Sequence, residues 1–157
     1  MKNIIRAVLI ALVSVWIFPP AVFGQVEWEA EITVSSAYVE SRLAIGQRND
    51  ADDQQDGRYD VPPMLAGSLR AWMLGSGTGL WRDIRASGST GEKDWQLVVD
   101  NRSGEQVVIS WSPPAFPAGA EMVLIDQASG KTVNMKKQSS YGLTDPAGGE
   151  VLMRLTY

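Results

Sequence analysis

Hydrophobic and polar residues alternate along much of the chain. From Trp28 to Val34 every second residue is apolar, and glutamates and a threonine occupy the positions between them. The same alternation marks Trp95–Val99 and Val151–Tyr157, although Val98 blurs it in the first of these segments. A period of two places successive side chains on opposite faces, so each segment predicts a β-strand with one buried face.

Turn-forming residues predict how these strands connect. Asp100–Gly104 separates the strand at 95–99 from one at 107–111, and Gln127–Gly130 separates 122–126 from 131–135, which predicts two hairpins. Residues 112–120 contain three prolines, which lack the donor of a sheet ladder, so we expect a crossover between two sheets there. No mature segment has a capped helical stripe. The predicted fold class is all-β, an antiparallel β-sandwich of about seven to nine strands.

The N-terminus has the three parts of a secretory signal peptide. Lys2 and Arg6 precede an apolar run from Ala7 to Phe18, and Gly24 ends a small-residue cleavage site. The run is shorter than the ~20 residues that span a bilayer. We therefore expect cleavage of residues 1–24, leaving 25–157 as a single β-sandwich domain with no transmembrane anchor. The expected location is the periplasm, the cell surface or the extracellular space.

Charge and missing residue types narrow the functions that fit. Without Lys2 and Arg6 the mature chain keeps 12 basic against 18 acidic residues, a net charge of −6, which argues against nucleic acid as a partner. The chain contains neither histidine nor cysteine, which removes Ser-His-Asp and Cys-His catalysis and the usual zinc sites. A carboxylate pair or a Ser-Lys dyad remains, but no spacing singles one out. We expect a protein that is not an enzyme.

An acidic stretch stands out within residues 47–68, which predict a long acidic and proline-containing loop. Asp50, Asp52, Asp56 and Asp60 surround Gly57 in a pattern similar to a calcium loop, whose oxygen ligands suit a hard cation. Pro63 occupies the position where an EF-hand needs a bidentate glutamate. The alternatives are a calcium site of another type and a solvated acidic loop whose glycine only makes a turn.

The tryptophans divide into two groups. Trp28, Trp95 and Trp111 lie on apolar strand faces, which favours core packing. Trp72 and Trp81 lie close to arginines, and an exposed pair there would stack on sugar rings or fill a pocket of a partner protein. The alternative is packing of the pair against the long loop.

Several motifs occur in a suggestive order. They are Leu43–Gly46, Asp56–Pro63, Trp81–Arg85, Trp95–Val99, Val107–Trp111 and Leu124–Asp126 with Gly130. In this order residues 42–157 resemble an immunoglobulin-like or fibronectin-III-like module of secreted and surface proteins of bacteria. The resemblance implies a β-sandwich that serves as a spacer or interaction module, and it carries no catalytic residues.

Two functions follow as expectations. The first is a non-catalytic exported interaction or structural module, a subunit or accessory of a cell-surface or extracellular assembly, with another exported protein or copies of itself as partner. Its motivation is a terminal strand, Val151–Tyr157, that could pair with another chain's sheet edge. The alternative is a carbohydrate-binding module that uses Trp72 and Trp81 to bind a glycan.

Overall fold

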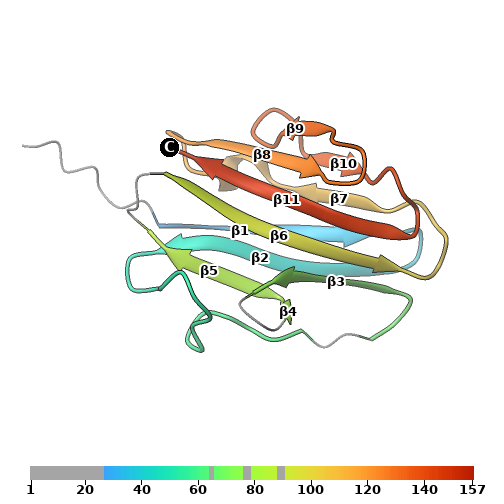
Figure 1. Ribbon diagram of the computed structural model, residues 1–157, viewed down its shortest axis with the longest axis horizontal. Coiled ribbons are helices and arrows are strands. Elements are labelled where there is room, and N and C mark those ends of the chain that lie inside the picture. Colours follow the sequence, from blue (N-terminus) through green and yellow to red (C-terminus); the bar gives the residue numbers. More distant parts are fainter. Residues whose placement is uncertain (1–26, 64–65, 76–78, 88–90) are drawn as a thin grey trace, which may run out of the picture.

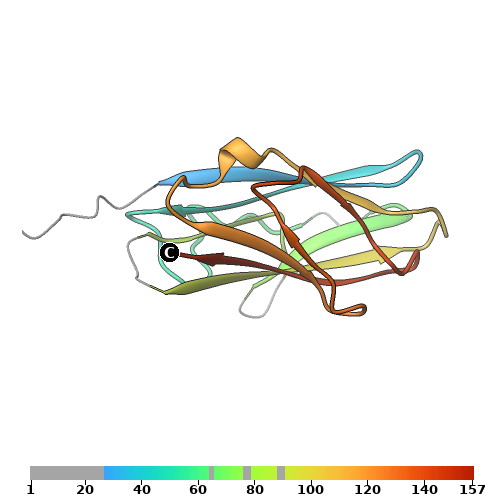
Figure 2. The same cartoon turned by 90° about the horizontal axis from the view of Figure 1, so that it is seen from above.

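A computed structural model describes residues 27–63, 66–75, 79–87 and 91–157, which fold into two facing β-sheets (Figures 1 and 2). The expected signal peptide, residues 1–24, lies outside the described residues. The five-stranded sheet has the order β10 (Ser140–Gly142), β7 (Val108–Trp111), β1 (Trp28–Ser35), β2 (Glu40–Arg48), β5 (Arg82–Ala86). The six-stranded sheet has the order β4 (Gly79–Leu80), β3 (Leu69–Leu74), β6 (Glu92–Asn101), β11 (Gly148–Thr156), β8 (Glu121–Asp126), β9 (Thr132–Asn134).

The all-β fold class is confirmed, with two corrections of detail. The described residues form eleven strands rather than seven to nine, because β4 and β10 have only two or three residues and show no alternation in the sequence. One pair is parallel: β5 runs alongside β2 in the same direction, after the chain has passed through the other sheet as β3 and β4. Among the described residues, no helix is long and apolar enough to cross a membrane.

The core lies between the sheets and is built from the inward residues of the alternating strands. Ile32 and Ile45 of one sheet face the space that Leu97 and Met153 of the other sheet fill, and all four are fully buried. Trp28, Trp95 and Trp111 are buried as predicted. Each of the three indole N–H groups donates to a protein acceptor, as buried tryptophans require: Gln47 Oε1 at 2.8 Å, the Asp83 carbonyl at 3.2 Å and the Met135 carbonyl at 2.7 Å.

Two predicted connections are confirmed and one is wrong. β8 and β9 form the expected hairpin, and residues 112–120 cross between the sheets through a short 3₁₀ turn at Pro113–Ala115. The predicted hairpin around Asp100–Gly104 does not form, because β6 and β7 belong to different sheets. Alternation shows which face of a strand is buried but not which sheet the strand joins, so a hairpin and a crossover have the same pattern here.

The C-terminal strand is also placed differently from our expectation. β11 is a central strand, hydrogen-bonded to β6 on one side and to β8 on the other (Figure 1). Its edges are therefore already paired, and it offers no free edge to another chain. The terminal position of a segment in the sequence does not determine its position in a sheet.

Candidate functional site

The acidic loop covers the outer edge of β5. The N–H of Val61 donates to the Arg82 carbonyl at 3.2 Å, and the N–H of Ala86 donates to the Asp52 carbonyl at 3.2 Å. Between these two points the N–H of Ile84 donates to a carboxylate oxygen of Asp60 at 3.1 Å. The segment therefore satisfies the outward backbone groups of β5 as a neighbouring strand would, which protects the edge from pairing with another chain.

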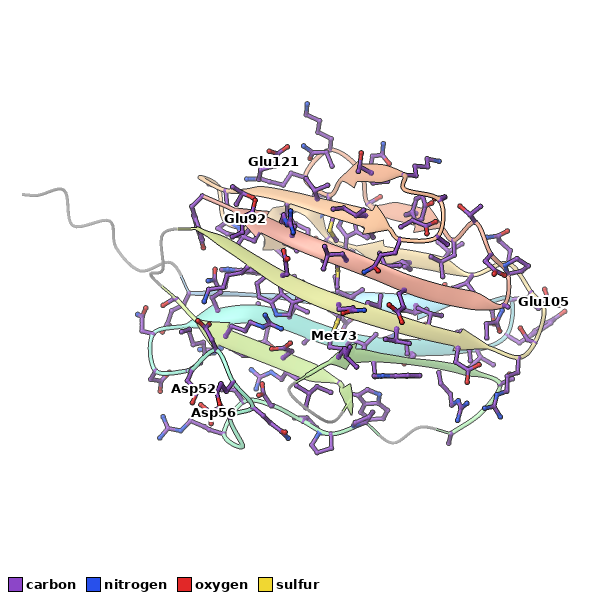
Figure 3. All side chains as sticks on the ribbon, viewed as in Figure 1. Asp52, Asp56, Met73, Glu92, Glu105 and Glu121 are labelled. Carbon is purple, nitrogen blue, oxygen red and sulfur yellow. The ribbon has the colours of Figure 1, made fainter. Side chains whose placement is uncertain are left out.

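The four aspartates that predicted a calcium site all accept hydrogen bonds from groups of the loop or of β5. Asp50 accepts from Arg58 and from the Tyr59 hydroxyl, Asp52 from the Gln54 N–H, Asp56 from the Arg58 N–H, and Asp60 from the N–H groups of Asp56 and Ile84. Figure 3 shows Asp52 and Asp56 on the loop beside β5. Across the described residues, no group of three or more acidic side chains is arranged to hold a metal ion.

Calcium binding by this loop stays a prediction. It requires Asp50 and Asp60 to leave their present donors and to converge with Asp52 and Asp56 around one ion. A melting temperature that rises with added calcium and falls with EDTA would support it.

Asp60 and its surroundings explain how the loop is fastened. The residue is only 7% exposed, and this burial raises the pKa of its carboxyl group, with the nearby charges of Asp83 and Asp56 adding to the effect. The hydrogen bonds from the two backbone N–H groups oppose the rise because they stabilise the anion. Asp60 is therefore a structural fastening between the loop and β5.

A second anchor joins the loop to the outer face of the five-stranded sheet. The guanidinium groups of Arg48, Arg58 and Arg82 each lie 5.8–5.9 Å from the ring centroid of Tyr59. Arg82 also binds both carboxylate oxygens of Glu29, at 2.9 and 2.6 Å, and this hydrogen bonding lowers the pKa of Glu29. The basic side chains around the loop are thus used to hold it in place.

Trp72 and Trp81 do not form the exposed pair that the sequence suggested. Trp72 points outward from β3 and is half-buried, with its ring against the backbone of Gly79. Trp81 follows β4 and packs against the core from the space between the sheets. Neither ring is among the exposed large hydrophobic side chains of the described residues. The pair was inferred from arginines nearby in the sequence. A neighbouring arginine does not determine toward which surface a tryptophan ring points.

Trp81 lines a groove of about 360 Å³ between the beginnings of β2 and β3. Glu40, Ser41 and Arg42 contribute to it from β2, and Arg70 contributes from β3. Both strands begin at the same end of the sandwich (Figure 1). Nothing in the sequence pattern indicated Glu40 or Arg42, because they come from a strand that pairs with β1 rather than with β3.

The two outer faces of the sandwich differ in character. The central strand β1 presents only polar side chains outward: Glu29, Glu31, Thr33 and Ser35. The six-stranded sheet presents six apolar side chains outward, all half-buried or exposed: Trp72, Leu74, Val98, Val123, Ile125 and Leu152. Trp72 lies directly across from Val98, and Leu152 across from Ile125. This face is turned toward the viewer in Figure 3.

The signal for this apolar face was present in the sequence. Val98 interrupts the alternation of β6, and Met122–Ile125 is a continuous apolar run in β8. Consecutive apolar residues in a strand place hydrophobic groups on both faces of the sheet. The consecutive apolar residues of β6 and β8 therefore indicated that the outer surface of their sheet is partly apolar.

No family model, curated protein or solved structure matches this chain.

Proposed function

We propose that this protein is an exported, non-catalytic interaction or structural module, a subunit or accessory of a cell-surface or extracellular assembly. The outer apolar face of the six-stranded sheet carries the proposal. A sheet with one solvated face normally has polar residues there, as β1 does, so six apolar side chains on the other face suit contact with a partner. The partner is another exported protein or a second copy of the chain.

The polar groups within this face fit the same role. Arg154 binds both carboxylate oxygens of Asp94 at 2.8 and 2.9 Å, and Gln96 donates to Glu150 at 2.7 Å. These groups have partners within the chain, so they remain paired when another protein covers the face. Val98 lies opposite Glu150 and Leu152 lies opposite Gln96, so apolar side chains and internally paired polar side chains alternate across the two central strands. Many protein interfaces are mixed in this way.

The sheet edges support contact through a face rather than through an added strand. β4, β9 and β10 are too short to template a long partner strand, and the acidic loop covers β5. We propose an immunoglobulin-like sandwich that binds its partner through one face. The chain lacks histidine, the most frequent general acid–base residue, and cysteine, and this composition suits a non-catalytic role.

The test replaces an apolar residue of this face by a charge. Leu152→Glu and Val98→Glu should weaken association at least about thirtyfold, because a buried charge at the centre of an interface costs 2 kcal/mol or more. The matched control is Thr33→Glu on the polar outer face of β1. Partners are captured from the native envelope by crosslinking, and light scattering after size exclusion detects self-association.

The outcome shows whether the apolar outer face is the interface. If capture and self-association are the same for Leu152→Glu and for the unchanged protein, the outer face is not the interface. The melting temperature of each variant is measured in parallel, and it should fall little, since Leu152 is only half-buried.

A further inference from the structure

The groove at Trp81 has the size and lining of a small-ligand site. Its volume of about 360 Å³ lies within the range of ligand pockets, ~300–1,000 Å³. Leu69, Ala71 and Trp81 give it an apolar lining, and Glu40, Ser41, Arg42 and Arg70 supply polar groups. Binding in this groove does not rest on the proposed function, because Trp81 and Arg42 lie outside the apolar outer face.

Trp81 differs from the tryptophans of the core in its hydrogen bonding. Trp28, Trp95 and Trp111 all donate their indole N–H to a protein acceptor. For Trp81, no acceptor among the described residues receives a hydrogen bond from the indole N–H, although the backbone N–H and carbonyl of the same residue are both bonded. A half-buried aromatic ring is suited to contact a ligand that has both apolar and hydroxyl-bearing surfaces.

Two arginines and one glutamate line the groove, and each arginine is paired with a carboxylate: Arg42 with Glu40 and Glu31, and Arg70 with Asp100. The Arg42 side chain is 61% exposed and pairs with Glu40 at 2.9 Å and with Glu31 at 3.9 Å, and an exposed pair of this kind contributes no more than about 1 kcal/mol. The guanidinium of Arg42 can therefore exchange Glu40 for an incoming carboxylate at little cost.

Arg70 contributes a buried donor without an acceptor among the described residues. Its Nη2 pairs with Asp100, but its Nε is buried and has no hydrogen-bond partner among the described residues. A buried donor without an acceptor is unfavourable by roughly 1–3 kcal/mol. A ligand oxygen bound in the groove beside Arg70 would remove this penalty, which a purely apolar ligand could not do.

We propose that this groove binds a saccharide that carries a carboxylate, a uronic-acid unit of an anionic glycan. The apolar face of the sugar ring packs against Trp81, and its hydroxyl groups bind Ser41 and Glu40. The carboxylate accepts hydrogen bonds from Arg42, whose planar guanidinium matches a carboxylate in a bidentate pair. Screening limits the repulsion by distant acidic residues to about 8 Å at physiological salt.

The experiment titrates the full chain with two probes that differ only in the carboxylate, methyl β-glucuronide and methyl β-glucoside, by NMR. We expect the glucuronide to bind at least about tenfold more tightly than the glucoside, because hydrogen bonds to a charged group contribute 1.5–3 kcal/mol. Arg42→Ala should remove this preference, and Trp81→Ala should weaken binding of both probes. Lys137→Ala, an exposed site outside the groove, removes one positive charge as a control, and Trp72→Ala removes an indole outside the groove.

Three results would overturn the proposal: no binding of the glucuronide at tens of millimolar, equal affinity for the two probes, or unchanged binding by Arg42→Ala. Trp81 packs against the core, so Trp81→Ala can lose stability. Arg42→Ala and Arg42→Gln decide the matter in that case, since the side chain is exposed and its loss does not disturb the core. Failure of these variants to alter binding does not bear on the apolar outer face, because Arg42 belongs to β2 of the other sheet.

Discussion

Asp126 is the residue with the most demanding structural role outside the core. One carboxylate oxygen accepts from the backbone N–H groups of Ala128 and Ser129 in the β8–β9 turn. The other accepts from the Tyr141 hydroxyl at 2.8 Å and the Thr144 hydroxyl at 3.0 Å. Because Tyr141 belongs to β10, this single side chain connects the hairpin of one sheet with the edge strand of the other.

The pKa of Asp126 follows from these contacts and gives a prediction about acid stability. Burial alone would raise the pKa, but the hydrogen bonds from Tyr141, Ser129 and Thr144 lower it to about 2. A pKa below the unfolded value means that Asp126 stabilises the fold above pH ~4, and that this contribution is lost as the pH falls from about 4 to about 2. Asp126→Asn should lower the free energy of unfolding by about 2 kcal/mol at pH 7.

Urea unfolding at pH 7, 4 and 2.5 provides the measurement. The difference between the unchanged protein and Asp126→Asn should shrink as the pH falls, and Asp52→Asn, at an exposed loop position, should show little difference at any pH. A gap that stays constant between pH 7 and 2.5 would contradict the assigned role of the ionised carboxylate.

For single residues, the sequence predicted which side chains are buried, because burial follows the alternation along each strand. The places of Trp28, Trp95 and Trp111 follow from the strand pattern, because each lies at an apolar position of its strand. The partners of Asp126 and Asp60 do not follow from any local pattern, because Tyr141 and Ile84 come from distant strands. The buried Gln47, which binds Trp28, the Ala86 carbonyl and Tyr157, was missed for the same reason.

Among the elements, the acidic loop gives the second prediction. Asp60→Ala removes the acceptor for the N–H of Ile84 at the outer edge of β5 and the acceptor for the Asp56 N–H within the loop. We expect faster amide hydrogen exchange at Ile84 and Ala86 and a loss of about 1–3 kcal/mol in stability. The amides of β6, which is central in the other sheet, serve as the internal reference.

The pH dependence of this fastening is opposite to that of Asp126. Because the pKa of Asp60 is raised in the folded protein, its contribution is present at low pH and falls as the pH rises through the folded pKa. If the amide hydrogen exchange of Ile84 is unchanged in Asp60→Ala, the backbone hydrogen bonds of Val61 and Asp52 hold the loop on β5 without the Asp60 carboxyl group.

The sequence predicted most of the long strands but not which strands become neighbours. β1, β6, β8 and β11 were recognised because each has one buried and one outward face, and the prolines of residues 112–120 correctly marked a crossover. The error at Asp100–Gly104 and the central place of β11 both concern the choice of neighbour. That choice is made by packing between distant strands, which alternation within one strand does not record.

For the whole molecule, the distribution of surfaces determines how it can associate. Three edge strands are short and the fourth is covered by the loop, whereas one outer face carries six half-buried or exposed apolar side chains. Association by strand addition at β5 would first have to displace the loop and break its hydrogen bonds to that strand, and the other three edges offer only two or three residues each. Association through the six-stranded sheet needs no such rearrangement, so we expect the face to be the point of contact.

The absence of cysteine from the chain allows a direct test of this geometry. A single cysteine at Val98 or Leu152, labelled with a short thiol-reactive crosslinker, should capture the partner or a second copy in high yield, because both positions lie on the central strands of the apolar face. A cysteine at Thr33, on the polar outer face of β1, should not. If Thr33 captures the partner and Val98 and Leu152 do not, the polar sheet is the interface. The apolar residues of the other sheet would then serve only cross-strand packing, which contributes about 0.2–1 kcal/mol for each pair.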